Sequence, residues 1–168
     1  MGAIGDAIRS ASDYLAEHRA EAAYADSAAA AIVESGLVVQ VRDPAGRTIR
    51  TDMPPAVGGS DSRPSPGWLF RAALAACNAT LIAMRAEMVG VPLSTVEVAV
   101  DSDSNDLGIL GLDPSTPAGP LRMRARVKIS SPSADKDTLA GIVAWAVAHC
   151  PVHDAVQRAV PISVEVIA

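Results

Sequence analysis

The chain has 168 residues and a mass of 17.2 kDa, a size that fits one domain. Apolar residues make up 49% of it and charged residues 20%, so it has enough core-forming side chains to fold. Its net charge of −5 argues against binding to nucleic acid, and the lack of a continuous apolar run of about 18 residues argues against a membrane span. Aromatic residues are only 3%, and a core of small side chains favours an oligomer.

The first 25 residues are predicted to form a helix. Ile4, Ile8 and Leu15 recur at helical spacing among charged residues. This start has no basic stretch followed by an apolar one, so we expect no signal peptide and a cytoplasmic protein. We interpret residues 1–25 as an N-terminal helical extension and residues 26–168 as the main domain.

Three short strands are predicted next, at residues 30–34, 37–42 and 47–52. Their apolar residues are mostly β-branched, and the sequence from Asp43 to Gly46 has the composition of a tight turn. Connections this short join neighbouring antiparallel strands, so the segment predicts a three-stranded meander.

A long helix is predicted from about residue 67 to residue 89. Ser65 is suited to cap its N-terminus, and Gly90 is suited to end it. Almost every residue between 72 and 83 is apolar or small, so this helix has no polar face and is expected to be buried on all sides. Cys77 lies in its middle.

The second half of the chain continues with strands and helices. We predict strands at 95–101 and 121–130 around a loop at 102–120, then a helix at 135–148, a short helix from Pro151, and a last strand at 162–167. One face of the strand at 121–130 carries four basic residues, Arg122, Arg124, Arg126 and Lys128, which we interpret as a solvated or acid-paired face. The order of elements predicts an α+β fold with mostly antiparallel sheets.

The two cysteines are the first candidates for chemistry. Cys77 is about three turns inside its helix, where the helix dipole helps little and apolar surroundings raise a thiol pKa. Cys150 precedes a proline at the expected start of a new helix, beside His149 and near His153, and this position favours a thiolate. The alternative is that both are buried cysteines that act as small apolar residues.

A zinc site is a second possibility at the same residues. His149, Cys150, His153 and Cys77 have the chemistry of zinc ligands. Pro151 breaks the helical register that would aim both imidazole rings at one ion, so we expect neither a metal nor another cofactor.

Several motifs together resemble the OsmC/Ohr family, named for osmotically inducible protein C and organic hydroperoxide resistance protein. They are Gly58-Gly59-Ser60-Asp61, Pro64-Ser65-Pro66, Leu74-Ala75-Ala76-Cys77 and His149-Cys150-Pro151-Val152. The resemblance covers about residues 30–168. It implies an intertwined homodimer in which antiparallel sheets pack around long buried central helices.

The resemblance also implies a reaction. In the peroxidases of the family, the cysteine that corresponds to Cys77 attacks an organic hydroperoxide and becomes a sulfenic acid. The cysteine that corresponds to Cys150 condenses with it to a disulfide, and an external dithiol reduces that disulfide. The chain departs from the family pattern where an Arg and a Glu support the thiolate, because Trp68 stands at the Glu position and Gly36 near the Arg position. Arg42, Arg47 and Arg50 are the candidate replacements.

Two functions from different classes therefore follow. The first is a thiol peroxidase for organic hydroperoxides, with Cys77 as nucleophile and Cys150 as resolving thiol. The second is a dimeric module without peroxidase activity that binds an apolar small molecule, in a pocket lined by Trp68, Leu69 and Phe70. A hydrolase or transferase that uses Cys150 with His149 or His153 is a further alternative.

Overall fold

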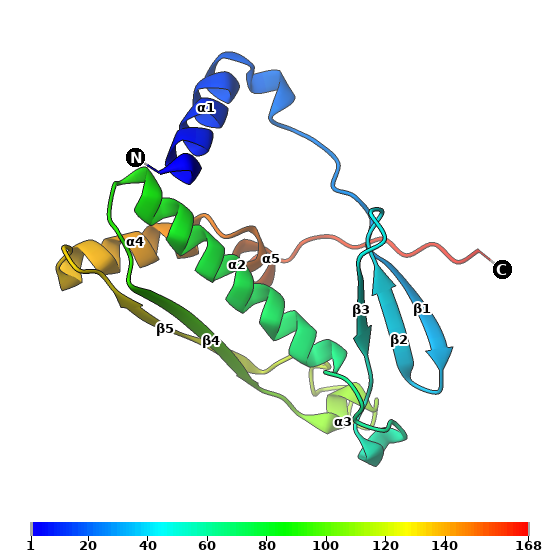
Figure 1. The fold of residues 1–168 in the computed structure, drawn as a ribbon. Coiled ribbons are helices and arrows are strands. Elements are labelled where there is room, and N and C mark those ends of the chain that lie inside the picture. Colours follow the sequence, from blue (N-terminus) through cyan, green and yellow to red (C-terminus); the bar gives the residue numbers. More distant parts are fainter. Residues whose placement is uncertain (1, 168) are drawn as a thin grey trace. The chain divides into compact units, whose positions relative to one another are not determined.

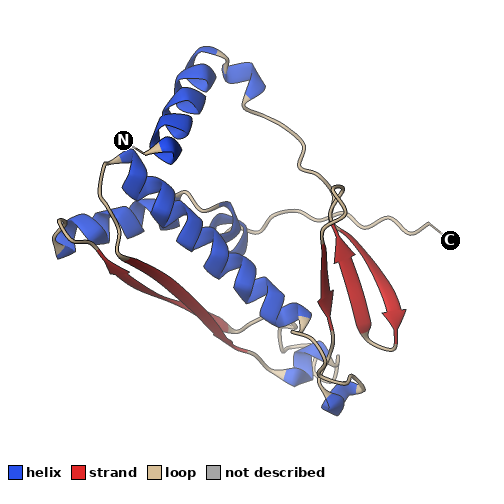
Figure 2. Ribbon diagram, viewed as in Figure 1, coloured by secondary structure: helices blue, strands red, loops and turns tan. Residues whose placement is uncertain are grey.

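The structure is a computed structural model that describes residues 2–167, and it has a mixed α+β architecture (Figures 1 and 2). Contacts group the chain into two compact units, one formed by residues 10–72 and the other by the chain up to Arg9 together with the chain from Ala73 onwards. The elements in chain order are α1 (Ala3–Glu17), η1 (Arg19–Glu21), β1 (Ala30–Ser35), β2 (Val38–Arg42), β3 (Thr48–Thr51), η2 (Pro55–Val57), α2 (Pro66–Met88), β4 (Thr95–Asp103), α3 (Asp106–Ile109), β5 (Arg122–Ser130), α4 (Lys136–Ala148) and α5 (Pro151–Gln157).

Strands β1, β2 and β3 form the predicted antiparallel meander. Val33 pairs with Val39, and Val41 pairs with Ile49 on the other side of β2. The turn between β2 and β3 has Gly46 at φ 83°, a left-handed conformation that a glycine adopts without strain. The strand order and the turn are therefore confirmed.

The loop that follows β3 is organised by one buried carboxylate. Asp52 is buried, and one of its oxygens accepts hydrogen bonds from the backbone N–H and the hydroxyl of both Ser60 and Ser62. These donors hold the pKa of Asp52 well below its usual range. At Gly59 the loop passes so close to the carbonyl of Met53 that a Cβ atom would collide with it.

Replacing Asp52 with Asn is expected to destabilise the protein, because an uncharged amide cannot accept all of these hydrogen bonds. We expect about a tenfold smaller folding constant from urea unfolding at pH 7. Since the folded-state pKa is lowered, the stabilisation by Asp52 is present above the unfolded pKa and is lost as the pH falls through the folded pKa. Asp61→Asn in the same loop is the control, and an equal loss in both variants would contradict this role for Asp52.

In the other unit, helices cover one face of the β4–β5 hairpin. Val96 pairs with Ile129 and Val98 with Val127, so these four side chains share a face. They pack against the core residues of α2 and α4, which are Ile82, Ala86, Ile142 and Ala146. In each helix the two core residues are four positions apart, and residues at that spacing lie on the same face of a helix. Each helix therefore contributes a single stripe to this core.

The opposite face of the hairpin carries the basic stripe, and acidic residues of β4 pair with it. Asp103 accepts hydrogen bonds from Arg122 at 2.9 Å and from Arg124 at 2.8 Å, and Asp101 forms ion pairs with Arg124 and Arg126. Lys128 lies opposite Glu97 in the register. The predicted acid-paired face is confirmed, and it gives no reason to assign a phosphate site there.

Helix α2 has the length and apolar composition of a membrane span, a property that core helices of soluble proteins share. Its buried residues within the single chain are Leu74, Asn78, Ile82 and Ala86, which form one stripe. Ile82 and Ala86 belong to the core described above, so this stripe of α2 packs within the protein.

Three local predictions were wrong. The helix expected over residues 1–25 ends at Glu17, with a short 3-10 turn after it, and the loop at 102–120 contains α3. The strand predicted at 162–167 has no regular structure, and Ile162 is 87% exposed. Alternating apolar residues make a strand only when a neighbour accepts and donates the backbone hydrogen bonds, and within residues 2–167 no segment pairs with this one.

Candidate functional site

The structure brings the two cysteines together. Cys77 lies about three turns into α2, and Cys150 lies between α4 and α5. Both are free thiols, and the Cys77 side chain lies close enough to Cys150 to raise the pKa of its thiol. Cys77 is half-buried, whereas Cys150 is 0% exposed. A pair of adjacent thiols with unequal access to solvent is suited to reversible disulfide chemistry.

Cys150 is held by the start of α5. Pro151 occupies the first helical position, and the Cys150 sulfur accepts a hydrogen bond from the backbone N–H of His153 at 3.4 Å. The pKa of Cys150 is nevertheless raised, first by burial and then by the hydrogen bond with Cys77. The expectation that this position favours a thiolate was wrong, because the backbone N–H groups lower the pKa by less than burial and Cys77 raise it.

The two histidines differ in their surroundings. His149 is exposed, and its ring stacks on Trp145 with 4.0 Å between centroids, while its Nδ1–H donates to the Trp145 carbonyl oxygen at 2.7 Å. His153 is half-buried. Over residues 2–167, no three His, Cys, Asp or Glu side chains gather as metal ligands, so the zinc arrangement considered above does not form.

Three further candidates, Arg42, Arg50 and Trp68, lie in the unit formed by residues 10–72. Arg50 on β3 donates two hydrogen bonds to the Glu34 carboxylate on β1, at 2.8 and 3.0 Å. This bidentate pair fixes the guanidinium on the sheet. Trp68 lies in the first turn of α2, where its backbone N–H donates to the Ser65 hydroxyl, and its side chain is 50% exposed.

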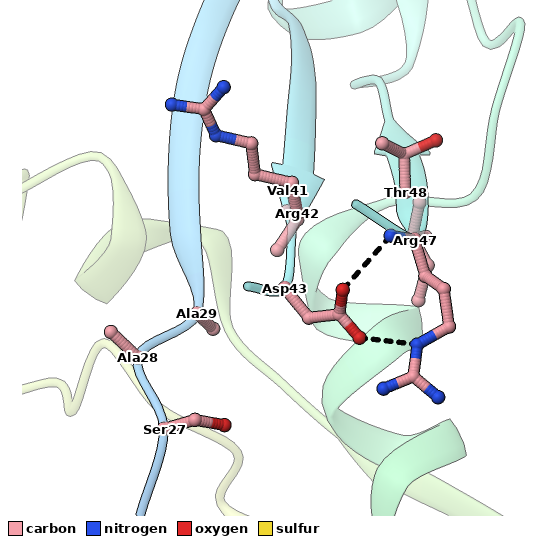
Figure 3. A pocket seen from close by; sticks show the side chains of 9 residues that line it. Ser27, Ala28, Ala29, Val41, Arg42, Asp43, Arg47 and Thr48 are labelled. Carbon is pink, nitrogen blue, oxygen red and sulfur yellow. Dashed lines mark hydrogen bonds and ion pairs between the residues drawn. The ribbon is translucent and has the colours of Figure 1, made fainter. Parts of the chain in front are cut away.

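Arg42 lines an open pocket of about 400 Å³ beside the β2–β3 hairpin (Figure 3). Apolar side chains, including those of Val41 and Ile49, form much of its lining. Arg47 also lines it, but the Asp43 carboxylate bonds to both the backbone N–H and the guanidinium of Arg47. Within the described part of the chain, the Arg42 guanidinium makes no hydrogen bond or ion pair, so its charge is available to a ligand.

Sequence reasoning missed Asn78, the residue after Cys77. Asn78 is 1% exposed, and over residues 2–167 neither its Oδ1 nor its Nδ2 has a hydrogen-bond partner. The signal that could have found it is a carboxamide in the middle of an otherwise apolar helical run.

Comparisons with known proteins agree with this fold. A family model described as OsmC-like protein matches residues 59–165. An organic hydroperoxide resistance protein OsmC from Legionella pneumophila is 21% identical, with a TM-score of 0.59 over 80% of this chain and 91% of that one. No curated protein matches the chain.

Two further solved structures are similar to this chain. An OsmC-like protein from Mycoplasma pneumoniae is 14% identical, with a TM-score of 0.68 over 82% of this chain and 91% of that one. The organic hydroperoxide resistance protein OhrB of Bacillus subtilis is 18% identical, with a TM-score of 0.54 over 80% of this chain and 93% of that one. At these identities the likeness establishes the fold.

Proposed function

The chain belongs to the OsmC-like protein family, and we propose that it is a thiol-dependent peroxidase that reduces organic hydroperoxides in the oxidative stress response. The observation that carries this proposal is that the free thiols of Cys77 and Cys150, far apart in the sequence, lie close enough to act on one another. Similar structures include proteins named for organic hydroperoxide resistance, which supports the substrate class.

The reaction has three steps. The Cys77 thiolate attacks the peroxide O–O bond, which breaks, so Cys77 becomes a sulfenic acid and the departing alkoxide takes a proton to leave as an alcohol. The Cys150 sulfur then attacks the Cys77 sulfur, an S–S bond replaces the S–O bond, and water leaves with the Cys150 proton. An external dithiol reduces the disulfide and restores both thiols. No metal or other cofactor takes part in these steps.

The burial of the two thiols supports this division of roles. The peroxidatic sulfur must meet a substrate that arrives from solvent, and Cys77 is the more exposed of the pair. Cys150 is enclosed and its pKa is raised, which makes it a poor first nucleophile. Cys150 needs only to reach the sulfur of its close neighbour Cys77.

A peroxidatic thiolate also needs a cation near it. We assign this role to Arg50, with Arg42 as the second choice. We also propose that the protein is a cytoplasmic homodimer and that the second chain contributes to each site. Arg50 is the better candidate because Glu34 already orients it. The exposed Trp68 and Phe70 on α2 support an association that covers them. His149 and His153 are assigned supporting positions beside Cys150.

The test is a count of free thiols before and after one equivalent of tert-butyl hydroperoxide. We expect the rapid loss of two thiols per chain and their return with a dithiol. Loss no faster than that of a free thiol in solution would exclude the peroxidase.

A second candidate function is the binding of an apolar small molecule without turnover. The observation that favours it is a groove of about 630 Å³ between β5 and α4, lined by apolar residues such as Val127, Leu139 and Val143. A ligand retained in native mass spectrometry, together with slow thiol oxidation, would favour this function over the peroxidase.

A further inference from the structure

Three side chains form a stack between α2 and the last turn of α4. The Arg85 guanidinium lies 4.8 Å from the ring centroid of Trp145, and the His149 ring stacks on Trp145 with 4.0 Å between centroids and 13° between planes. The His149 Nδ1–H also donates a hydrogen bond to the Trp145 carbonyl oxygen at 2.7 Å. A guanidinium over an indole ring is attracted by the negative face of the ring. Arg85 therefore ties α2 to the end of α4 through Trp145.

The Trp145 ring takes the place of an acidic partner for Arg85. Arg85 is half-buried in the last turn of α2, and over residues 2–167 its guanidinium makes no hydrogen bond or ion pair. Removing a guanidinium from water without an acidic partner is unfavourable, and the ring face offsets part of that loss. A positive charge also suits the C-terminal end of a helix, but a side chain turned to solvent would serve there equally well. The contact with Trp145 is therefore the feature to explain.

The stack lies directly before the thiol to which we assign the resolving role. His149 ends α4, and its backbone N–H donates to the carbonyl oxygens of Trp145 at 3.1 Å and Ala146 at 3.3 Å. Cys150 is the next residue, and its side chain is buried. The place of the Cys150 backbone therefore follows from the place of the helix end, which the stack fixes.

The other end of the stack belongs to the helix that carries Cys77. Arg85 follows Cys77 by about two turns of α2, on the order of 12 Å along the helix axis. The Cys77 side chain acts on the Cys150 thiol, and the core cluster also joins α2 to α4. Because both thiols are attached to the segments that Arg85 and Trp145 hold together, this contact limits how far one sulfur can move from the other.

We propose that Arg85 is a positioning residue for the disulfide, which holds Trp145 so that the Cys150 sulfur stays within reach of Cys77. This inference rests on the proposed peroxidase function, in which the Cys150 sulfur attacks the sulfenic acid at Cys77. The S–S bond forms as the S–O bond breaks, and the hydroxide leaves as water with the Cys150 proton. A thiol that is held in place attacks as if it were present at a much higher concentration. Arg85 acts on this step through Trp145 and takes no part in the making of bonds.

The first test measures the disulfide without any hydroperoxide. In mixtures of reduced and oxidised dithiothreitol, the two protein thiols form a disulfide as oxidised dithiothreitol takes up their two hydrogens and two electrons. Arg85→Met keeps most of the length of the side chain and removes its charge, and we expect the equilibrium constant for disulfide formation to fall about fivefold. Arg85→Lys keeps a cation and should stay within about twofold of wild type. An unchanged constant in Arg85→Met would overturn the proposal.

Two further variants separate positioning from general stability. Trp145→Leu removes the ring, so adding Arg85→Met to it should lower the constant no further. If Trp145→Leu does not fold, Trp145→Phe takes its place, and Arg85→Met should then lower the constant by less than it does in wild type. Arg126→Met is the matched control in the same unit, because Arg126 is exposed on the outer face of the hairpin. An equal loss with and without the Trp145 ring, or a loss of the same size in the control, would overturn the proposal.

The second test uses one equivalent of tert-butyl hydroperoxide. In Arg85→Met, Cys77 should oxidise at a rate within about twofold of wild type, whereas the disulfide should form about fivefold more slowly, so that dimedone traps more of the sulfenic acid. A first oxidation slowed as much as disulfide formation would overturn the positioning role. If the wild-type protein does not consume hydroperoxide, the peroxidase is excluded, yet the equilibrium constants in dithiothreitol still decide the role of Arg85.

Discussion

Cys77→Ser is expected to abolish hydroperoxide consumption, whereas Cys150→Ser should still complete one oxidation per chain. A serine hydroxyl is a poor nucleophile at neutral pH, so the initial rate of peroxide loss should fall by a factor on the order of 100 or more in Cys77→Ser. In Cys150→Ser, Cys77 should react once and stay as a sulfenic acid, because no thiol is next to it. A hydroperoxide assay and the intact mass of each variant measure both effects.

The two variants also separate the proposed peroxidase from the alternative in which Cys150 is the nucleophile. If Cys150 attacked first with help from His149 or His153, Cys150→Ser would lose the first oxidation and Cys77→Ser would retain it. The structure favours the first order, because Cys150 is enclosed and His149 is turned onto Trp145. A retained first oxidation in Cys77→Ser would reverse the roles that we propose.

Local sequence patterns predicted most of the elements because their signals lie within a few residues. Ser65 and Pro66 begin α2, and the helix stops two residues before Gly90. Alternation in β5 predicted both of its faces correctly, since a strand needs only a period of two to separate them. The boundaries of α2, β4, β5 and α4 were therefore within two residues of those predicted.

The pairing of Cys77 with Cys150 came from the family resemblance and not from spacing. The contact depends on how α2 packs against α4, and no local pattern encodes that packing. The predicted direction of the Cys150 pKa was wrong for the same reason. The sequence shows that Cys150 lies close to a helix N-terminus, but it does not show that the side chain is completely buried. The strand predicted at 162–167 was wrong for a similar reason, since alternating apolar residues cannot show whether a partner strand is present.

The last prediction concerns the packing that holds this thiol pair in place. Ile82 is 0% exposed and lies in the core cluster where α2 meets α4. Its neighbours Ala86 and Ala146 are small, so they cannot fill the space that a truncated side chain leaves. Ile82→Ala should therefore lower the free energy of unfolding by about 2–5 kcal/mol, measured by urea denaturation.

The matched control is Ile109→Ala on the short helix α3, where the side chain is 55% exposed and the expected change is within about 0.5 kcal/mol. Because Cys77 lies on α2 and Cys150 follows the end of α4, Ile82→Ala should also slow disulfide formation, in proportion to the loosened packing between the helices. A small loss of stability in Ile82→Ala, equal to that of the control, would mean that the α2–α4 contact does not hold the core together.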